Sequence, residues 1–493
     1  MVLHDAAFPL KLLKPHQSII WSECMAERRY SAKEREQRIK EVARGVLPYV
    51  KPSDKERGLA LVRINQIMGR LKQVAPRKAE IVVAGSFARG TNLRGDSDVD
   101  IFLLFPKSVP KENMERIALE IAKKVTKSHR NESYTMKYAE HPYVRLLLGD
   151  IGMNVDVVPA YKIRSADEMG TAVDRTQLHN EFVRSRLSGS HRDDVLVLKS
   201  FLKAHSIYGA DARTEGFSGY LCELLIIHYG TFAQLLEAMA NAKAAIAIRV
   251  GEKADQAETA VLVKRFSKNF VVIDPTDDNR NVAANVSLES FARLALAARR
   301  FIADPSKRTF YGIAHSERHA AAGLARVRKQ MGSAMGLYAI CFGIAKGVSE
   351  EIIWQQLKRL RIRLEGALAK RGFAPVLSIQ EVGDGEAVIG IFTNDTEIAY
   401  KISKGPSALS AGASESFWKA HKNALFFSLE SERIYAVERS ELAKPMHVLR
   451  AELNGHDLLP SYLSARRMKI YRNKIPERLA KMIYRAYAIK TEV

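Results

Sequence analysis

The chain has 493 residues, 47% hydrophobic and 27% charged, an ordinary profile for a soluble protein of about three domains. Its 77 Lys and Arg against 55 Asp and Glu give a formal charge of +22, which indicates a polyanionic partner unless the organism's proteins are generally basic. Nucleic acid is favoured over a membrane because no amphipathic anchor stands out in the sequence. The longest uncharged apolar stretch, 331–345, is also shorter than the roughly 18 residues of a membrane-spanning helix.

The first predicted elements are helices. Residues 1–24 carry no strong pattern, and 1–40 are interpreted as an N-terminal extension, with either Met1 or Met25 as the start. Apolar residues recur at helical spacing over 32–50 and 53–74, and Ser53 followed by Glu56 is a capping-box pattern. These helices are expected to pack under a sheet.

Residues 81–105 carry the strongest chemical signal. A short apolar run over 81–84 predicts a buried strand, which Gly85-Ser86 interrupts, and a second apolar strand carries Asp98 and Asp100. Two residues apart on a strand, these carboxylates lie on the same face. Because like charges this close need a cation, a hard divalent metal such as Mg²⁺ beside a phosphate-binding turn is expected. The pattern indicates nucleotidyl transfer.

Further strands are predicted beyond the helix at 110–127. The stretch 134–148 reads as two strands, and 153–161 as another, which carries Asp156 among valines. A lone acid in such a run is either a polar residue on an exposed face or a third metal ligand. The neighbouring Asp-x-Asp strand favours the ligand.

Residues 166–300 are expected to be mostly helical. One helix runs from Asp193-Asp194 to Ile207, with Lys199 on it and Tyr208 at its end. The remaining predicted elements are a helix over 218–236, a helix over 242–247, a strand over 270–275, and a helix that starts from the turn at 277–281 and continues to 296.

From about residue 301 the pattern predicts an α+β region. An amphipathic helix spans 349–371, and its cations are expected to form an ordinary solvated face. Strands are predicted over 374–380, 387–392, 424–428 and 434–437. The stretch 461–490 holds nine Lys or Arg against the single Glu477, a local charge of +8, with four tyrosines interleaved, which indicates a nucleic-acid surface.

The Gly-Ser turn, the Asp-x-Asp strand and the later strand with Asp156 resemble the DNA polymerase beta nucleotidyltransferase superfamily, although Ser97 relaxes one apolar position. Seven motifs narrow the resemblance to archaeal-type (class I) CCA-adding enzymes, which are tRNA nucleotidyltransferases. These motifs are Gly85–Thr91, Ala139–Val144, Val155–Pro159, Ala172–Thr176, Ile207–Gly209, Gly216–Leu224 and Asp274–Asn285.

The resemblance implies an α+β multidomain fold. It consists of a polymerase-beta-like nucleotidyltransferase head with a mixed sheet and helices, a helical central domain, an α+β RNA-binding body and a basic helical tail. The corresponding boundaries are 1–40 for the extension, 41–165 for the catalytic domain, 166–300 for the central nucleotide-binding domain, 301–440 for the RNA-binding domain and 441–493 for the basic tail region.

The resemblance also implies an activity: template-independent addition and repair of the 3′-terminal CCA of tRNA with CTP and ATP, by two-metal-ion transfer with Mg²⁺. The implied catalytic and metal-binding residues are Asp98, Asp100 and Asp156, and the nucleotide-binding residues are Gly85, Ser86, Arg89, His179, Lys199, Tyr208 and Arg280. The basic stretch adds Arg466, Arg467, Arg472 and Lys474 as RNA contacts. Asp96 is interpreted as a turn or N-cap residue.

Other interpretations stay open. A poly(A) polymerase-like RNA tail-adding enzyme shares the metal and phosphate motifs, and a non-catalytic RNA-binding protein could keep the fold. Taken singly, Lys199 reads as a side chain with a buried stem, His179 as a surface or capping residue and Tyr208 as a packing residue. The three cysteines, Cys24, Cys222 and Cys341, match neither a metal site nor a disulfide framework, which favours the cytoplasm. A homodimer is left open.

Overall fold

The computed structural model describes residues 31–96, 98–126, 132–138, 142–242, 245–252, 255–311, 320–332, 334–345, 347–454 and 460–491. They form two compact units. Of these described residues, the first unit contains those up to Leu202, Ser218–Ala284 and Phe291–Phe310, and the second contains Lys203–Phe217, Asn285–Ser290 and those from Tyr311 onward. Within the described ranges, none of the helices has both the length and the apolar character needed to cross a membrane.

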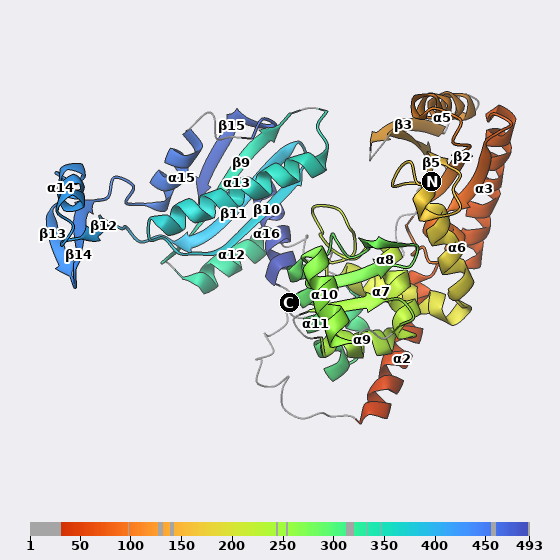
Figure 1. The fold of residues 1–493 in the computed structure, drawn as a ribbon, viewed down its shortest axis with the longest axis horizontal. Helices are drawn as coiled ribbons and strands as arrows, with labels where there is room; N and C mark the ends of the chain where they lie inside the picture. Colours follow the sequence, from red (N-terminus) through yellow and green to blue (C-terminus); the bar gives the residue numbers. More distant parts are fainter. Residues whose placement is uncertain are drawn as a thin grey trace. The chain divides into compact units, whose positions relative to one another are not determined.

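The first unit contains a mixed five-stranded sheet of order β1-β2-β5-β4-β3, in which β2 and β5 are parallel and the other neighbours antiparallel. Its strands are β1 Glu80–Ala84, β2 Asp98–Phe105, β3 Glu132–Tyr138, β4 Pro142–Leu148 and β5 Met153–Tyr161. The helices of this region are α2 Ala32–Val50, α3 Asp54–Val74, α4 Gly85–Arg89 and α5 Lys111–Thr126 (Figure 1).

Helices α3 and α5 cover one face of this sheet. Ile67 of α3 and Met114 of α5 are fully buried against alternate residues of β2, such as Ile101 and Leu103. The two-residue period of the strand therefore turns Asp98 and Asp100 to the opposite face. The predicted capping box at Ser53 and Glu56 is confirmed at the start of α3.

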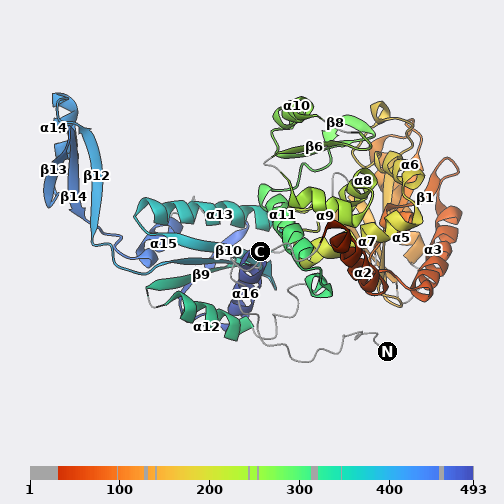
Figure 2. The ribbon, with the colours of Figure 1, turned by 90° about the horizontal axis from the view of Figure 1, so that it is seen from below.

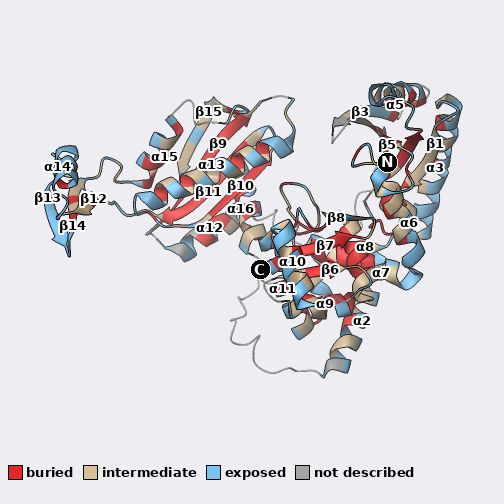
Figure 3. Cartoon of the chain, in the orientation of Figure 1, coloured by how far each residue is buried: buried red, intermediate tan, exposed pale blue. Residues whose placement is uncertain are grey.

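The rest of the first unit is mainly helical, with a small sheet of order β6-β7-β8. Its elements are η1 Ala166–Glu168, α6 Thr176–Arg186, α7 Gly189–Ala204, α8 Gly219–Tyr229, α9 Phe232–Ala240, β6 Ile246–Arg249, α10 Gln256–Phe266, β7 Phe270–Asp274, β8 Asp277–Asn281, α11 Leu288–Ala303 and η2 Lys307–Phe310. Figure 3 shows burial along the whole of β7 and through the middle of α8, from Leu221 to Ile226.

Four predictions for this region are wrong in detail. The helix expected to run from 193 to 207 starts earlier, at Gly189, and ends at Ala204. The helix expected over 218–236 is two helices, because Gly230 has φ +87° and Thr231 caps the next one. Part of the stretch 242–247 belongs to strand β6, residues 243 and 244 lying outside the described ranges, and 277–281 is strand β8.

The second unit is built on an antiparallel sheet of order β10-β11-β9-β15. Helices α13 and α15 pack on one face, and α12 and α16 on the other (Figure 2). The elements are α12 Ala320–Met331, β9 Met335–Ile344, α13 Glu350–Lys370, β10 Pro375–Gly383, β11 Glu386–Asn394, α15 Pro445–Asn454, β15 Leu463–Arg472 and α16 Glu477–Thr491. The tail is therefore not only helical: β15 pairs with β9 as part of the sheet.

A smaller sheet of order β12-β14-β13 completes the second unit. Its elements are β12 Tyr400–Ser407, α14 Ala411–Ala420, β13 Phe426–Glu430 and β14 Arg433–Arg439. Ile434 and Ala436 of β14 are buried, whereas every residue of β13 is exposed (Figure 3). The strands expected over 424–428 and 434–437 correspond to β13 and β14.

Candidate active site

Three carboxylates lie on the sheet face opposite α3 and α5. In the parallel pairing of β2 and β5, Asp100 is opposite Asp156, and Asp98 is opposite Asn154. The Asp98 side chain is 56% exposed and accepts a 2.8 Å hydrogen bond from Nδ2 of Asn154, whereas the Asp156 side chain is only 9% exposed. The structure thus brings all three predicted acids to one face of adjacent strands.

Arg145 joins these carboxylates from β4. It is opposite Asp156 in the register of β4 and β5, and its Nε and one terminal nitrogen each lie 2.7 Å from an oxygen of Asp156. The same terminal nitrogen is 3.7 Å from Oδ2 of Asp98. Sequence reasoning missed this residue, although a lone cation in the apolar run of β4 was a usable signal.

The electrostatics of the face favour a further cation. Burial, together with the charges of Asp156 and Asp98, raises the pKa of Asp100 to about 6. Carboxylate oxygens are the donors that hard divalent ions prefer, so the donor set fits such an ion by its chemistry. Among the described residues no three His, Cys, Asp or Glu side chains are gathered closely enough to hold a metal ion, and Arg145 occupies both oxygens of Asp156.

A tight turn adjoins the carboxylates. Gly85 has φ +71°, and a Cβ atom at this position would lie 1.9 Å from Oδ2 of Asp100. Only glycine therefore allows the start of α4 to approach this carboxylate. Ser86 follows on α4 and is partly exposed, and its carbonyl accepts a 2.9 Å hydrogen bond from the backbone N–H of Thr91.

A buried network orders the chain after this turn. Nε of Arg89 lies 2.9 Å from Oε1 of Glu223, which also accepts from the hydroxyl of Thr91. Arg89 donates to Asn180 of α6 as well. Nζ of Lys199, 1% exposed, donates a 2.8 Å hydrogen bond to the carbonyl of Thr91, and burial lowers the pKa of this lysine. Two predicted nucleotide-binding residues thus meet around Thr91: Lys199 directly, and Arg89 through Glu223.

Glu223 was not predicted. It is completely buried on α8, and its Oε2 has no hydrogen-bond partner among the residues that the structure describes. A lone acid inside the apolar motif Gly216–Leu224 was the available signal, since a buried charge is kept only where it is paired.

A second buried network joins two further predicted residues. His179 and Arg280 both donate to Oδ2 of Asp274, each at 2.8 Å, and the Tyr220 hydroxyl lies 3.3 Å from Oδ1. The rings of His179 and Tyr220 stack with centroids 3.9 Å apart. Burial opposes ionisation of Asp274, but the hydrogen bonds from His179 and Thr276 outweigh it and hold its pKa well below the usual range. Burial lowers the pKa of His179.

Tyr208 lies in the segment Lys203–Phe217, which belongs to the second unit, where it forms a parallel bridge with Phe217. Its contact with nucleotide stays a prediction.

The predicted RNA-binding cations lie on and after β15 in the second unit. Arg467 and Lys474 are exposed, and the side chain of Arg466 is outside the described residues. Nε of Arg472 lies 2.8 Å from Oδ2 of Asp395, so this cation is already ion-paired.

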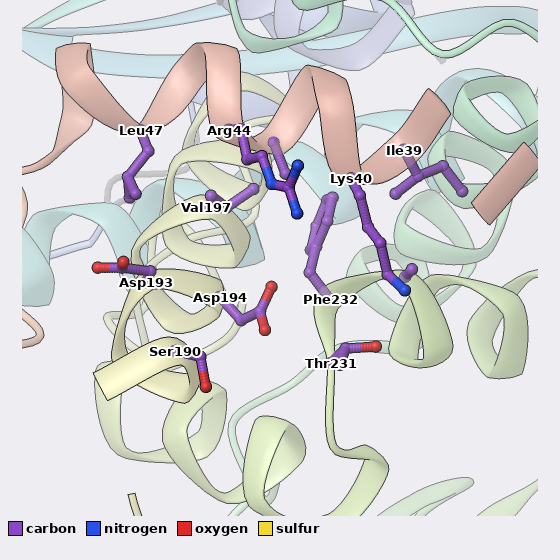
Figure 4. Close-up of a pocket in the computed structure, with 12 residues that line it drawn as sticks. Ile39, Lys40, Arg44, Leu47, Ser190, Asp193, Asp194, Val197, Thr231 and Phe232 are labelled. Carbon is purple, nitrogen blue, oxygen red and sulfur yellow. The ribbon is translucent and has the colours of Figure 1, made fainter. Parts of the chain in front are cut away.

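Two hollows of the first unit lie apart from the carboxylates. One, of about 550 Å³, shares Ala84 and Phe102 with the strands that lead to the carboxylates, and Asn180 lines it from α6. The other, of about 290 Å³, lies among α2, α7 and α9, with Lys40 and Arg44 on one side and Asp194 on the other (Figure 4). Neither lining includes a predicted site residue, so both are separate from the carboxylates themselves.

Three family models match the chain in succession. They are described as a nucleotidyltransferase domain over residues 63–179, a tRNA nucleotidyltransferase second domain over 193–311, and a CCA-adding enzyme C-terminal domain over 334–458. The nucleotidyltransferase domain contains the three carboxylates and implies a divalent metal.

Curated relatives match over most of the chain. The CCA-adding enzyme of Methanocaldococcus jannaschii is 35% identical over 349 residues, 68% of this chain and 73% of that protein. The CCA-adding enzyme of Saccharolobus shibatae is 35% identical over 419 residues, 83% of this chain and 92% of that protein. The solved structure of the Cid1 poly(U) polymerase with MgGTP bound aligns with 57% of this chain and 99% of its own at 16% identity, with a TM-score of 0.44.

Proposed function

The chain belongs to the CCA-adding enzyme family, and on that premise we propose that it rebuilds the 3′-terminal C-C-A of tRNA from CTP and ATP without a nucleic-acid template. The observation that carries the chemistry is the placement of Asp98, Asp100 and Asp156 on one sheet face beside the turn at Gly85. The match to a CCA-adding enzyme C-terminal domain favours this activity over A-tail addition.

Asp98, Asp100 and Asp156 are the residues proposed to hold the divalent metal, and Mg²⁺ is the proposed ion because it is the common partner of phosphates. The chemistry that such an ion supplies is activation of the attacking 3′ hydroxyl and neutralisation of charge on the leaving pyrophosphate. Asp98, with a side chain 56% exposed, is the most accessible of the three acids to an incoming ion. Arg145 keeps Asp156 oriented toward the shared face.

The remaining roles concern the nucleotide. Gly85 and Ser86 are proposed to offer backbone N–H groups and a hydroxyl to the triphosphate, with Arg89 as the neighbouring cation. His179, Lys199, Tyr208 and Arg280 are the further residues proposed to hold the nucleotide. Lys199 donates to the carbonyl of Thr91, whose backbone N–H donates to Ser86, so it supports the segment that follows the turn.

The tRNA body needs a surface of its own, because a tRNA is far longer than one active site. The 301–440 region and the basic stretch after residue 460 are proposed to hold it, through Arg466, Arg467, Arg472 and Lys474. The domain boundaries given above and a cytoplasmic location are part of this proposal. The proposal is compatible with either a monomer or a homodimer.

The test is one incubation of the protein with tRNA that lacks its 3′-terminal C-C-A, together with CTP, ATP and Mg²⁺. The expected products are two C additions followed by one A, after which extension stops, with little use of GTP or UTP. The matched control is Asp100→Asn, which keeps the side-chain size. Long A-only tails on an arbitrary RNA would instead support the tail-adding alternative, and no extension at all would contradict both.

A further inference from the structure

Asp274 accepts hydrogen bonds from three separate elements of the first unit and from the turn that follows β7. Its Oδ2 accepts from His179 of α6 and Arg280 of β8, and its Oδ1 from Tyr220 of α8. The backbone N–H and the hydroxyl of Thr276 add bonds of 3.0 and 2.8 Å to Oδ1. The carboxylate is completely buried, so five donors satisfy a charge that water does not reach.

A buried network of this kind can serve only to stabilise the fold. The partial exposure of Arg280, however, indicates that the network also prepares a side chain for ligand binding. Its side chain is 32% exposed, and one terminal nitrogen donates to Asp274. A guanidinium has five N–H donors in a rigid planar fork. Held by a buried carboxylate on a side chain that is still about one third exposed, the guanidinium is pre-organised to donate to a ligand, because little side-chain freedom remains to be lost on binding.

His179 is constrained by the same carboxylate. An ionised carboxylate only accepts, so Nε2 of His179 must carry the proton that faces Asp274. The stack on Tyr220 holds the plane of the ring. The carboxylate therefore sets both the tautomer and the direction of this imidazole, as second partners of functional histidines commonly do.

We propose that Asp274 is the positioning residue of the nucleotide site, which fixes the guanidinium of Arg280 and the imidazole of His179 before CTP or ATP arrives. This inference rests on the proposed function, since it assigns these two side chains to nucleotide binding. Asp274 itself touches neither substrate nor reacting atoms. Its effect passes through Arg280 first, because that side chain is the more exposed of the two.

The test is a double-mutant cycle of the parent, Asp274→Asn, Arg280→Ala and the double variant, with KM and kcat measured for CTP and for ATP. Losing a charge-assisted hydrogen bond is expected to raise KM about tenfold or more in Asp274→Asn, with kcat changed by less than about threefold. If Asp274 acts through Arg280, its substitution has little further effect on KM once Arg280 is alanine. If Asp274 has only a structural role, Asp274→Asn lowers the melting temperature, and its effect on KM is the same whether residue 280 is arginine or alanine.

Thr276→Val is the matched control, because it removes one hydrogen bond to Oδ1 without touching Arg280 or His179; its KM is expected to stay within about twofold of the parent. Independent, additive effects of Asp274→Asn and Arg280→Ala would overturn the proposal. If Asp274→Asn does not fold, Asp274→Glu replaces it in the cycle, since it keeps the charge and displaces it by one methylene.

The cycle also separates this proposal from the proposed function. Should the parent add neither C nor A to tRNA, the proposed function fails, and the same four proteins are compared by titration with CTP alone. The positioning role is still supported if Asp274→Asn lowers CTP affinity relative to the parent, while the double variant binds CTP as tightly as Arg280→Ala alone. Equal CTP affinity in the parent and Asp274→Asn, or no CTP binding by the parent, overturns it.

Discussion

The guanidinium of Arg145 donates hydrogen bonds of 2.7 Å to both carboxylate oxygens of Asp156. A bidentate pair of this kind is among the stronger polar contacts in proteins, and it fixes the orientation of the acid. It also places a positive charge where a metal ion would otherwise balance Asp156. Arg145 and a divalent ion are therefore expected to compete for this carboxylate.

Arg145→Gln is predicted to increase the affinity of the protein for Mg²⁺ and to lower the melting temperature without metal. Removal of one partner leaves the other charge poorly compensated, which destabilises partly buried pairs. The measurement is the melting temperature as a function of Mg²⁺ concentration. Lys162→Gln is the control, because its 2.6 Å pair with Glu80 is exposed. Identical Mg²⁺ dependence of Arg145→Gln and the parent would contradict the competition.

The metal-free protein is predicted to gain stability through Asp100 as the pH falls from 7 to 5. Burial and the charges of Asp156 and Asp98 raise the pKa of Asp100 to about 6, so the folded state binds this proton more tightly than the unfolded chain. The contribution is fully present only below the ordinary aspartate pKa of about 4, is partly retained at pH 5, and is lost as the pH rises through about 6.

The measurement for Asp100 is the melting temperature of the parent minus that of Asp100→Asn at pH 5 and at pH 7, both in chelator. Subtraction cancels the contributions that other titrating groups make to the pH dependence in both proteins. His179 is one such group, and its lowered pKa acts in the opposite direction. The expected result is a more positive difference at pH 5. A difference independent of pH would show that Asp100 titrates normally.

Asp98→Asn and Asp100→Asn are each predicted to reduce both C and A addition by about a thousandfold or more, because the loss of charge weakens metal binding. Affinity for tRNA should be largely unchanged. Asp96→Asn is the matched control and should keep most activity. The opposite ranking, an inactive Asp96→Asn beside an active Asp98→Asn, would mean that the register of the metal strand has been misassigned.

Glu223→Gln is predicted to destabilise the protein by roughly 3–5 kcal/mol, since it leaves the guanidinium of Arg89 buried without its counter-charge. The variant is also expected to raise KM for both nucleotides, because Arg89 loses its orientation. Chemical denaturation measures the first effect. Glu258→Gln, in the more exposed pair with Arg249, should cost less than about 1 kcal/mol. Equal losses in the two variants would remove the special role assigned to Glu223.

Neutralising Arg466, Arg467 and Lys474 together is predicted to weaken tRNA binding and to reduce its salt slope by about one unit per lost phosphate contact. Nucleotide addition at saturating tRNA should change little. Arg472→Gln is tested separately, because this cation pairs with Asp395, so its loss should lower stability. Unchanged affinity and slope in a folded triple variant would make this stretch an ordinary solvated surface.

The carboxylates could be predicted because their signal is local. Alternation along β2 puts Asp98 and Asp100 on one face, whatever the strand pairs with. Arg145, Glu223 and Asp274 could not be assigned in the same way. Each gains its role from a partner that strand register or helix packing brings close, and a single sequence does not specify those long-range pairings.

The errors in secondary structure have a similar cause. Strand β15 has a basic sequence, and its register shifts between Ser464 and Lys469, which disturbs the alternation that identifies a strand. Strand β8 is the polar run Asp277–Asn281, paired with β7 at the edge of a small sheet. In both cases hydrogen bonds to a neighbouring strand outweigh weak local preference.

The position of β15 has a consequence for how the protein folds during synthesis. Strand β9 pairs with β11 on one side and β15 on the other, and β15 is translated only after α13, the three-stranded sheet and α15. Until β15 leaves the ribosome, one edge of β9 has unpaired backbone N–H and C=O groups that can pair with a strand of another chain. Helix α16, which covers the sheet face formed in part by Leu337 and Ala339, is translated later still. The nascent second unit therefore carries an open edge and an apolar face that α12 alone covers only in part, the kind of intermediate that chaperones bind.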